Sequence, residues 1–257
     1  MLHVPVLLEE SLDFLLNDLS GSYLDLTFGR GSHSKEILNR LSLSGKLFAV
    51  DRDLEAVSYG KDNITDKRFK IFHANYSDID VLFSEQQFNG ILLDLGTCST
   101  HLDNYSRGFS FQGEGPLDMR MDTSQGFSAQ SFLNESTELE ISNVIYKYGE
   151  EKASRRIAKA IVKFRKHTLI QSTSDLVKII ESVLKRTGKK HPATKTFQAI
   201  RIHVNNELEH LEIALGKLSR LLAEQGVIAI ISFHSLEDRI VKNFFKPDIQ
   251  SLPKDIP

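Results

Sequence analysis

The stretch that decides the fold is YLDLTFGRGSH, residues 23–33. An apolar run containing Asp25 leads into two glycines, Gly29 and Gly31, and a helical pattern begins directly afterwards. A strand, a short glycine loop and a helix in this order are typical of the first unit of a nucleotide-binding α/β domain, because residues without a Cβ let backbone N–H groups approach a ligand closely. We therefore predict a parallel sheet built outward from this stretch.

The first hundred residues repeat this alternation of short apolar runs and helical patterns, which favours a parallel sheet covered by helices. We predict strands at 22–27, 46–51, 69–74 and 89–94, and helices at 32–41, 53–61 and 78–86. The alternation then stops until residues 226–233, GVIAIISF. The unbroken apolarity of that run predicts one more strand, buried on both faces.

The chain between the fourth strand and the last one has a helical period. In residues 150–166, Ala153, Ile157 and Ile161 share one face, while basic residues occupy another. We predict a mostly helical domain, residues 109–195, inserted into an α/β domain formed by 1–108 and 196–257. Helices at about 194–223 return the chain to the sheet.

Charge is distributed unevenly along the chain. Residues 151–201 contain fourteen Lys and Arg and three acidic residues, a net charge of +11, which leaves −13 for the rest of a chain whose total is −2. A basic lobe on an acidic body indicates a polyanionic partner. We predict that this lobe contacts nucleic-acid phosphates through Lys152, Arg156, Lys159, Lys163, Lys166, Lys189, Lys190 and His191.

Polar residues follow the predicted strands where each one ends. Asp51 closes the second strand, 22 residues after Gly29, a spacing that suits a carboxylate binding the ribose hydroxyls of a nucleotide-like cofactor. Tyr76 and Asp94 follow the third and fourth strands, and ligands of open parallel sheets bind outside these carboxyl ends. Asp25 is either a further polar group near the cofactor or a buried carboxylate that holds the loop N–H groups.

The glycine loop also bears on which cofactor binds. Ser32, His33 and Ser34 follow Gly31, so the loop is not the G-x-G-x-x-G of dinucleotide-binding proteins. A nicotinamide-dependent oxidoreductase is therefore less favoured than a protein that binds S-adenosylmethionine, which offers ribose, adenine and an amino-acid tail. The nine His residues form no spaced metal motif, and we expect no metal.

Cys98 is the only cysteine, which excludes an intramolecular disulfide and a four-cysteine zinc site and favours an intracellular protein. The N-terminal run lacks a basic leader, and residues 227–231 are too few to span a bilayer. We expect a soluble, cytoplasmic protein. We also expect His234, with Glu237, to cap the helix that follows the last strand.

At several of these residues the chain resembles the bacterial 16S ribosomal RNA cytosine-N4 methyltransferases, the MraW or RsmH family. The matching segments occur in family order: HVPVLLEE, DLTFGRGSH, AVDRD, GILLDLG, RGFSFQGEGPLDMRMD, YGEEKASRRIAKAI, KHPATKTFQAIRIHVNNEL and ISFHSLEDRIVKNFF. The resemblance implies a class I (Rossmann-like) methyltransferase domain with an inserted helical domain, acting on a cytidine in the decoding region of the small ribosomal subunit. Carried onto this chain, the family's cofactor contacts fall at Gly31, Ser32, His33, Asp51, Tyr76, Asp94 and His101.

The chain departs from the family pattern at three places. Ser32 stands where the family usually has Gly, and DLGTCSTHLD replaces DLGVSSPQLD, which puts His101 at a Gln position. Family members usually continue beyond the segment that matches HSLEDRIVKNFF, whereas this chain ends with KPDIQSLPKDIP. A non-catalytic factor that binds cofactor and RNA during ribosome assembly is therefore an alternative.

The chemistry expected at the fourth strand leaves two alternatives. In N4 methylation a hydrogen-bond acceptor helps the cytosine amine attack the methyl group, and Asp94 is the catalytic residue we expect in that role. In C5 methylation a thiolate first adds to the ring, and Cys98 would be the nucleophile. The second reaction needs Cys98, whereas the first does not.

Overall fold

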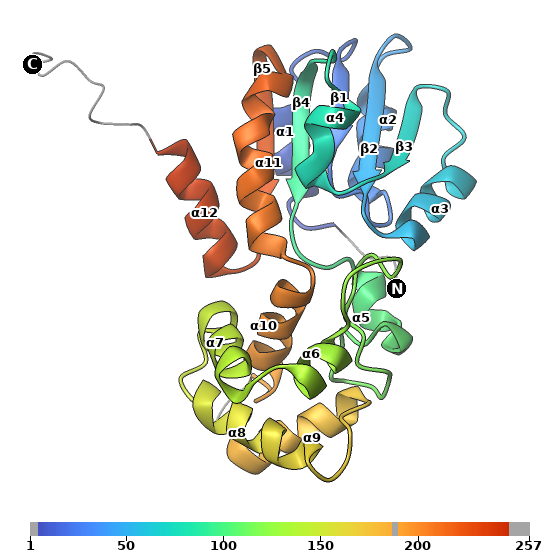
Figure 1. The fold of residues 1–257 in the computed structure, drawn as a ribbon. Coiled ribbons are helices and arrows are strands. Elements are labelled where there is room, and N and C mark those ends of the chain that lie inside the picture. The colour runs from blue at the N-terminus through green and yellow to red at the C-terminus, as the bar shows by residue number, and fades with distance from the viewer. Residues whose placement is uncertain (1–4, 187–189, 247–257) are drawn as a thin grey trace, which may run out of the picture.

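The computed structural model describes residues 5–186 and 190–246 (Figure 1). The strands are β1 (Ser22–Asp25), β2 (Lys46–Asp51), β3 (Phe69–His73), β4 (Phe88–Asp94) and β5 (Leu222–Ile231). The helices before the inserted region are α1 (Leu8–Leu15), α2 (Ser32–Arg40), α3 (Leu54–Asn63), η1 (Tyr76–Asp78), α4 (Ile79–Leu82), α5 (Ser99–Asp103) and η2 (Tyr105–Arg107). The later helices are α6 (Ala129–Glu135), α7 (Glu138–Gly149), α8 (Ser154–Arg165), α9 (Thr173–Val183), α10 (Thr194–Val204), α11 (Glu207–Leu221) and α12 (Ser235–Phe245).

The five strands form one parallel sheet in the order β3-β2-β1-β4-β5. This confirms the predicted α/β class and the first four strands to within two residues at each end. The chain moves outward from β1 to β3 and then returns to the other side of β1 with β4. Such a reversal of strand order opens a ligand crevice outside the carboxyl ends of the central strands.

Side chains of the central strands alternate between two apolar layers. Leu24, Ile91 and Leu93 pack with α4 and α11, whereas Tyr23 and Leu92 pack with α1 and α2 on the opposite face. Each fully buried Leu or Ile contributes roughly 1.5–3 kcal/mol relative to an exposed one. Burial on both faces therefore fixes the strands that carry the polar residues at their ends.

The last strand differs from its prediction. Residues 222–231 form β5, and most of its apolar residues are half-buried, with Ile231 the buried exception. Within the described residues β5 pairs with β4 alone, so one of its edges has no strand beside it. The apolar run correctly indicates contact with both helical layers, through Ile228 on one face and Ala229 on the other, but it carries no information about edge position.

Helices α6, α7, α8, α9 and α10 lie together at one end of the molecule (Figure 1). Buried residues from Phe109 to Val204 form an apolar core of this helical region. In α8, Ile157 and Ile161 are buried in this core. The core continues into α10 beyond residue 195, while the domain division at 109 and 195 remains a prediction. No helix in the described part of the chain is long and apolar enough to cross a membrane.

Asn205 joins the helical region to the sheet domain. It lies in the break between α10 and α11, where its side chain accepts a hydrogen bond from the Met121 N–H at 2.8 Å and donates one to the Met119 carbonyl at 2.7 Å. Its own carbonyl accepts a hydrogen bond from the Arg52 guanidinium at 2.8 Å. Asn205 thus links the loop before α6, through its side chain, to the loop after β2, through its backbone carbonyl.

Candidate active site

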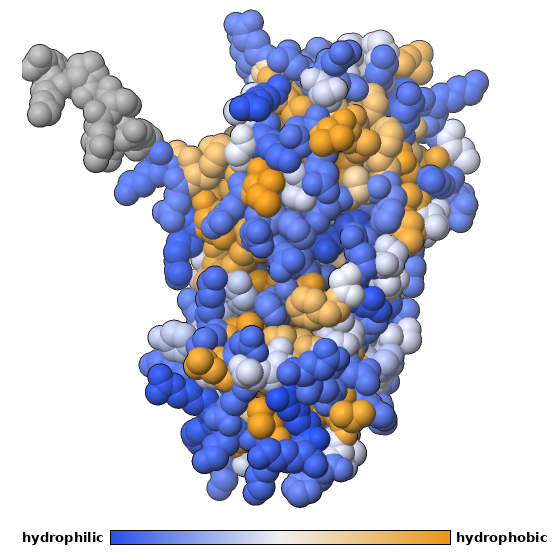
Figure 2. Space-filling view, viewed as in Figure 1, coloured by the Kyte–Doolittle hydropathy of each residue, from blue (hydrophilic) through white to orange (hydrophobic). Residues whose placement is uncertain are grey.

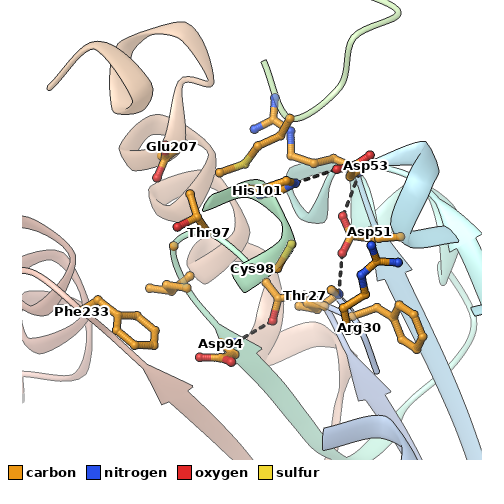
Figure 3. Close-up of a pocket in the computed structure, with 18 of the residues that line it drawn as sticks. Thr27, Arg30, Asp51, Asp53, Asp94, Thr97, Cys98, His101, Glu207 and Phe233 are labelled. Atoms are coloured by element: carbon orange, nitrogen blue, oxygen red, sulfur yellow. Dashed lines mark hydrogen bonds and ion pairs between the residues drawn. The ribbon is translucent and has the colours of Figure 1, made fainter. Parts of the chain in front are cut away.

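A cavity of about 580 Å³ lies outside the carboxyl ends of β1, β2 and β4 (Figure 3). The loop after β1 forms one wall, the residues after β2 and η1 form a second, and α5 and α11 close it. Six of the seven predicted cofactor positions line this cavity: Ser32, His33, Asp51, Tyr76, Asp94 and His101. The structure therefore brings together residues that lie as much as 69 positions apart in the sequence.

Gly31 is the one predicted position that is absent from the described cavity wall. It precedes α2 with a φ of 69°, and a Cβ at this position would lie 2.5 Å from the ring of Phe28. Only glycine accommodates both the left-handed backbone and the contact with the ring. Its role in this structure is to direct the chain from the loop into α2.

Asp25 has the loop-holding role that was one of its two predicted alternatives. Its carboxylate accepts hydrogen bonds from the Ser34 hydroxyl at 2.6 Å and from the Thr27 N–H at 3.1 Å. The side chain is buried, and burial raises the pKa of Asp25 to about 6. Asp25 therefore fixes the glycine loop from behind.

Asp51 ends β2 with both carboxylate oxygens oriented by the backbone. Oδ2 accepts a hydrogen bond from the Gly29 N–H at 2.7 Å, and Oδ1 accepts one from the Asp53 N–H at 2.8 Å (Figure 3). Burial raises the pKa of this carboxyl group, although the two N–H donors oppose the shift. Because each oxygen still has acceptor capacity, the carboxylate is held ready for a pair of hydroxyl donors.

Asp94 is a second carboxylate of the cavity, at the end of β4. Its Oδ1 is buried without a hydrogen-bond partner, and its Oδ2 lies 3.7 Å from Nδ1 of His33. Burial, together with the charges of Asp25 and Glu237, raises the pKa of Asp94 to about 7. A buried acceptor without a donor is costly, so this oxygen is the position in the cavity where a ligand N–H is most needed.

Tyr76 stands in η1 with its hydroxyl turned away from solvent. The hydroxyl donates a hydrogen bond to the Glu207 carbonyl at 3.3 Å, and burial raises the pKa of this phenol. In the same wall the Glu207 carboxylate accepts hydrogen bonds from the Arg201 guanidinium at 2.8 and 2.9 Å. The Tyr76 hydroxyl is thus committed to α11, and its ring remains available to a planar ligand.

His101 belongs to a buried charged network. Its Nε2 lies 2.6 Å from Oδ2 of Asp53, which also accepts a hydrogen bond from Arg107 at 2.9 Å. The ring stacks on Phe109 with centroids 4.7 Å apart. The other ring nitrogen, Nδ1, is buried and has no hydrogen-bond partner. Asp53, Arg107 and Phe109 were not predicted, because nothing in their local sequence marks the network.

Phe233 was also missed as a site residue. It follows β5, lines the cavity and has 55% of its surface exposed. Its N–H donates a hydrogen bond to Glu237, which His234 joins in a capping box at the start of α12. The predicted capping role of His234 is confirmed. The available signal for Phe233 was an aromatic residue directly after a strand, at the edge of the sheet where ligands bind.

The predicted RNA-binding residues lie on the helical region, at a distance in sequence from the cavity. The basic residues named on and beside α8 are all exposed: Lys152, Arg156, Lys159, Lys163 and Lys166. Lys190 is exposed too, whereas Lys189 lies outside the described residues. His191 stacks on Phe111 at 4.7 Å and lies 3.4 Å from Glu181. Figure 2 shows the end of the molecule formed by these helices as mostly hydrophilic, with a few separate apolar residues.

The parallel sheet, the glycine loop and the acid after β2 together define a nucleotide-cofactor-binding α/β protein. The model of the MraW methylase family matches residues 1–257. The chain belongs to this family.

Curated relatives extend this similarity over nearly the whole chain. The chain is 51% identical to the ribosomal RNA small subunit methyltransferase H of Legionella pneumophila (strain Corby), over 95% of this chain and 81% of that protein. It is 46% identical to the protein of the same name from Ruthia magnifica subsp. Calyptogena magnifica, over 99% of this chain and 85% of that protein. The chain is also 48% identical to the protein of that name from Caldicellulosiruptor bescii, over 99% of this chain and 85% of that protein.

Proposed function

We propose that this protein is an S-adenosylmethionine-dependent methyltransferase that modifies N4 of a cytidine in the decoding region of 16S ribosomal RNA, within the small ribosomal subunit of the cytoplasm. Membership of the MraW methylase family and relatives named ribosomal RNA small subunit methyltransferase H support this class of reaction. The observation that carries the chemistry is Asp94, whose buried Oδ1 has no hydrogen-bond partner in the cavity.

The cavity fits a cofactor that combines a ribose, a planar base and a charged tail. Asp51 would accept the two ribose hydroxyls, since the Gly29 and Asp53 N–H groups already orient its carboxylate. Tyr76 would contact the adenine ring. Ser32 and His33 would lie along the tail, where His33 Nε2 is buried without a partner. His101 would contribute Nδ1, because Asp53 occupies Nε2.

S-adenosylmethionine, when bound, supplies an electrophilic methyl group on a sulfonium. The protein has to present the amine of cytosine, a poor nucleophile whose lone pair is delocalised into the ring. Asp94 as a carboxylate would accept a hydrogen bond from that amine and then its proton, because a pKa of about 7 suits proton transfer near neutral pH. Asp94 is therefore the proposed catalytic residue.

Phe233 completes the proposed base site. Its exposed ring is on the cavity wall with Asp94, and a Cβ at Gly96 would lie 3.5 Å from it. A target base must leave its stack to reach the cavity, and stacking on an aromatic side chain contributes about 1–3 kcal/mol per base. Phe233→Ala should raise the KM for RNA by roughly tenfold or more, whereas Phe244→Ala, an exposed aromatic of α12, should leave it unchanged.

We further propose that residues 109–195 form the substrate-recognition domain. The RNA would be held by the exposed basic side chains on and beside α8, together with those of the loop before α10: Lys152, Arg156, Lys159, Lys163, Lys166, Lys189 and Lys190. Their separation from the cavity matches the needs of a large substrate, because phosphate contacts position an RNA without reading its sequence. His191 is less suited to such a contact, since its ring is stacked on Phe111.

The decisive experiment is methylation of small ribosomal subunits that lack the modification, followed by analysis of the modified base. N4-methylcytidine is the expected product, and an unmodified subunit despite bound cofactor would support the assembly-factor alternative. C5 methylation is the second candidate, because Cys98 lines the same cavity and its pKa is lowered by His101 in spite of burial. Cys98→Ala should retain methyl transfer. A complete loss with cofactor affinity intact would favour the C5 reaction.

A further inference from the structure

Cys98 lies between the cofactor cavity and the glycine loop. It directly precedes α5, lines the cavity and is half-buried. Its Sγ is 2.8 Å from the Thr100 hydroxyl, which can donate a hydrogen bond to the sulfur. A Cβ at Gly29 would lie 3.3 Å from the Cys98 Cβ, so the thiol packs against the loop that orients Asp51.

His101, three residues later, lines the same cavity, and its backbone N–H donates a hydrogen bond to the Cys98 carbonyl at 3.0 Å. The ring is 6% exposed, its Nε2 is hydrogen-bonded to Asp53, and its Nδ1 has no hydrogen-bond partner. The Asp53 carboxylate stabilises a protonated ring from the opposite side, much as the carboxylate of a catalytic triad does. Because Asp53 occupies Nε2, a protonated ring has one remaining N–H, at Nδ1, and this atom is buried without a hydrogen-bond partner.

The ionisation of the two groups agrees with this geometry. Burial lowers the pKa of His101, but the hydrogen bond with Asp53 and the neighbouring Cys98 outweigh burial and raise it to about 9. Burial alone would raise the pKa of the Cys98 thiol, whereas His101 and the Thr100 hydroxyl lower it. A thiolate beside an imidazolium is the form in which a cysteine reacts.

We propose that Cys98 is a thiolate modification site in the wall of the cofactor cavity, and that its reagent is hydrogen peroxide. The sulfur attacks one peroxide oxygen, an S–O bond forms and the O–O bond breaks. The product is a sulfenic acid, and the leaving hydroxide takes the proton of the His101 imidazolium and becomes water. The sulfur loses two electrons, which the peroxide gains. A dithiol restores the cysteine, with its own oxidation to a disulfide and release of the oxygen as water.

The added oxygen has a direct structural consequence. It would enter the space between the glycine loop and α5, and it would compete for the His101 N–H. We expect sulfenic acid formation to weaken cofactor binding, a consequence that rests on the proposed function. The thiolate itself does not depend on which cofactor the cavity binds, so the two statements are tested separately.

Other charges around the thiol belong to three segments. Asp51 and Asp53 follow β2, Glu55 lies in α3, and Arg107 lies in η2, where it contacts both Asp53 and Glu55. Arg107 and Asp53 offset one another, and Glu55 is on the exposed side. His101 is therefore the charge whose removal should most affect Cys98.

The first test measures alkylation of the free protein by iodoacetamide as a function of pH. Cys98 is the only thiol in the chain, so the unfolded protein in concentrated urea gives the reference midpoint for the same sulfur. We expect the folded midpoint to lie below this reference. His101→Gln should return it toward the reference and slow the reaction near pH 7 on the order of tenfold. His191→Gln, a half-buried histidine on the helical region, is the matched control and should change neither.

A second variant distinguishes a midpoint that changes because a charge is lost from one that changes because the fold is damaged. Asp53→Asn keeps the imidazole but removes its negative partner, so it should also raise the midpoint, while the circular dichroism of each variant reports whether it is folded. A folded wild-type midpoint at or above that of the unfolded chain would overturn the proposal. The proposal would also be overturned if His101→Gln and Asp53→Asn were both folded and neither changed the midpoint of alkylation.

The second test measures the consequence of oxidation. Treatment with hydrogen peroxide, followed by a sulfenic-acid probe and mass spectrometry, should label Cys98 and lower the affinity for S-adenosylhomocysteine about tenfold or more, with recovery after dithiothreitol. Cys98→Ala should lose this peroxide sensitivity, expressed as the ratio of treated to untreated affinity. Labelling without any change in affinity would refute the coupling to the cofactor, whereas failure to label would refute the site. If no S-adenosylhomocysteine bound to the untreated protein, the proposed function would fail and the alkylation result would stand.

Discussion

Replacing Asp94 by Asn should remove methyl transfer and stabilise the protein at alkaline pH. The side chain is 27% exposed, and burial with the charges of Asp25 and Glu237 raises its pKa from 3.8 to about 7. The asparagine has nearly the same shape but no charge to bury. A residue placed only for stability would show the opposite result, since its replacement would lower the free energy of unfolding.

The magnitude follows from the difference between the folded and unfolded pKa values. A rise of the Asp94 pKa by roughly three corresponds to a loss of about 4 kcal/mol in the free energy of unfolding if solvent does not screen the charge. The side chain is partly exposed, and solvent reduces this loss to about 1–2 kcal/mol. The folded pKa is raised, so the favourable contribution of the protonated group is present below about pH 4 and is lost as the pH rises through about 7. The variant and the wild type should therefore match in stability near pH 4 and differ fully above pH 7.

Urea unfolding of both proteins at about pH 5 and about pH 8.5 measures this difference, and methylation of small ribosomal subunits measures activity. Asp62→Asn is the control, because Asp62 is exposed on α3 and its replacement should change the free energy of unfolding by less than about 0.5 kcal/mol. The reasoning is refuted if Asp94→Asn is no more stable relative to the wild type at the higher pH than at the lower one. Activity that persists in the variant would separately remove Asp94 from the proposed reaction.

Three further results are expected. Asp51→Asn should weaken binding of S-adenosylhomocysteine about 100-fold in calorimetry. The amide would turn its NH₂ toward one of the two N–H donors, and each such hydrogen bond to a charged group is worth about 1.5–3 kcal/mol. A change below about threefold would contradict the assigned contact. Replacing Lys152, Lys159 and Lys163 together by Ala should reduce the slope of log affinity against log salt for RNA by roughly two to three, with cofactor affinity unchanged, and an unaltered slope would place the RNA elsewhere. Asn205→Ala should lower the free energy of unfolding by about 2–3 kcal/mol in urea, since it leaves the buried Met121 N–H and Met119 carbonyl unpaired, and a loss below about 0.5 kcal/mol would show that water replaces the amide.

The parallel sheet could be predicted because its signals are local. Continuous apolar runs mark strands that are covered on both faces, as Leu24 and Leu92 are, and helical periods between them force parallel crossovers. The strand ends then follow from topology, so the amino-acid sequence alone is enough to place Asp51 and Asp94 at one cavity. The family resemblance added His33 and His101, which no strand-end argument selects.

The remaining features depend on contacts between distant segments. The pairing of Asp53 with His101 joins residues 48 positions apart, and neither has a neighbour in sequence that signals the other. The edge position of β5 depends on which strands are beside it, a property that the apolarity of Ile228 and Ile230 does not carry. Phe233 was missed because the apolar run placed it inside the predicted strand 226–233, whereas β5 ends at Ile231 and leaves Phe233 on the cavity wall.

The charges of the cavity favour a cationic cofactor and a carboxyl group, Asp94, that accepts a proton only during the reaction. Burial, together with the charges of Asp25 and Glu237, raises the pKa of Asp94, so the free cavity holds more negative charge than it stabilises. A sulfonium offsets part of that charge, which favours the carboxylate form of Asp94 when the methyl donor is present. Methyl transfer removes the cofactor's sulfonium charge and releases a proton, and both changes make protonation of Asp94 more favourable. In the proposed function, the Asp94 carboxyl group would bind the donor as an anion and would accept the proton at the end of the reaction.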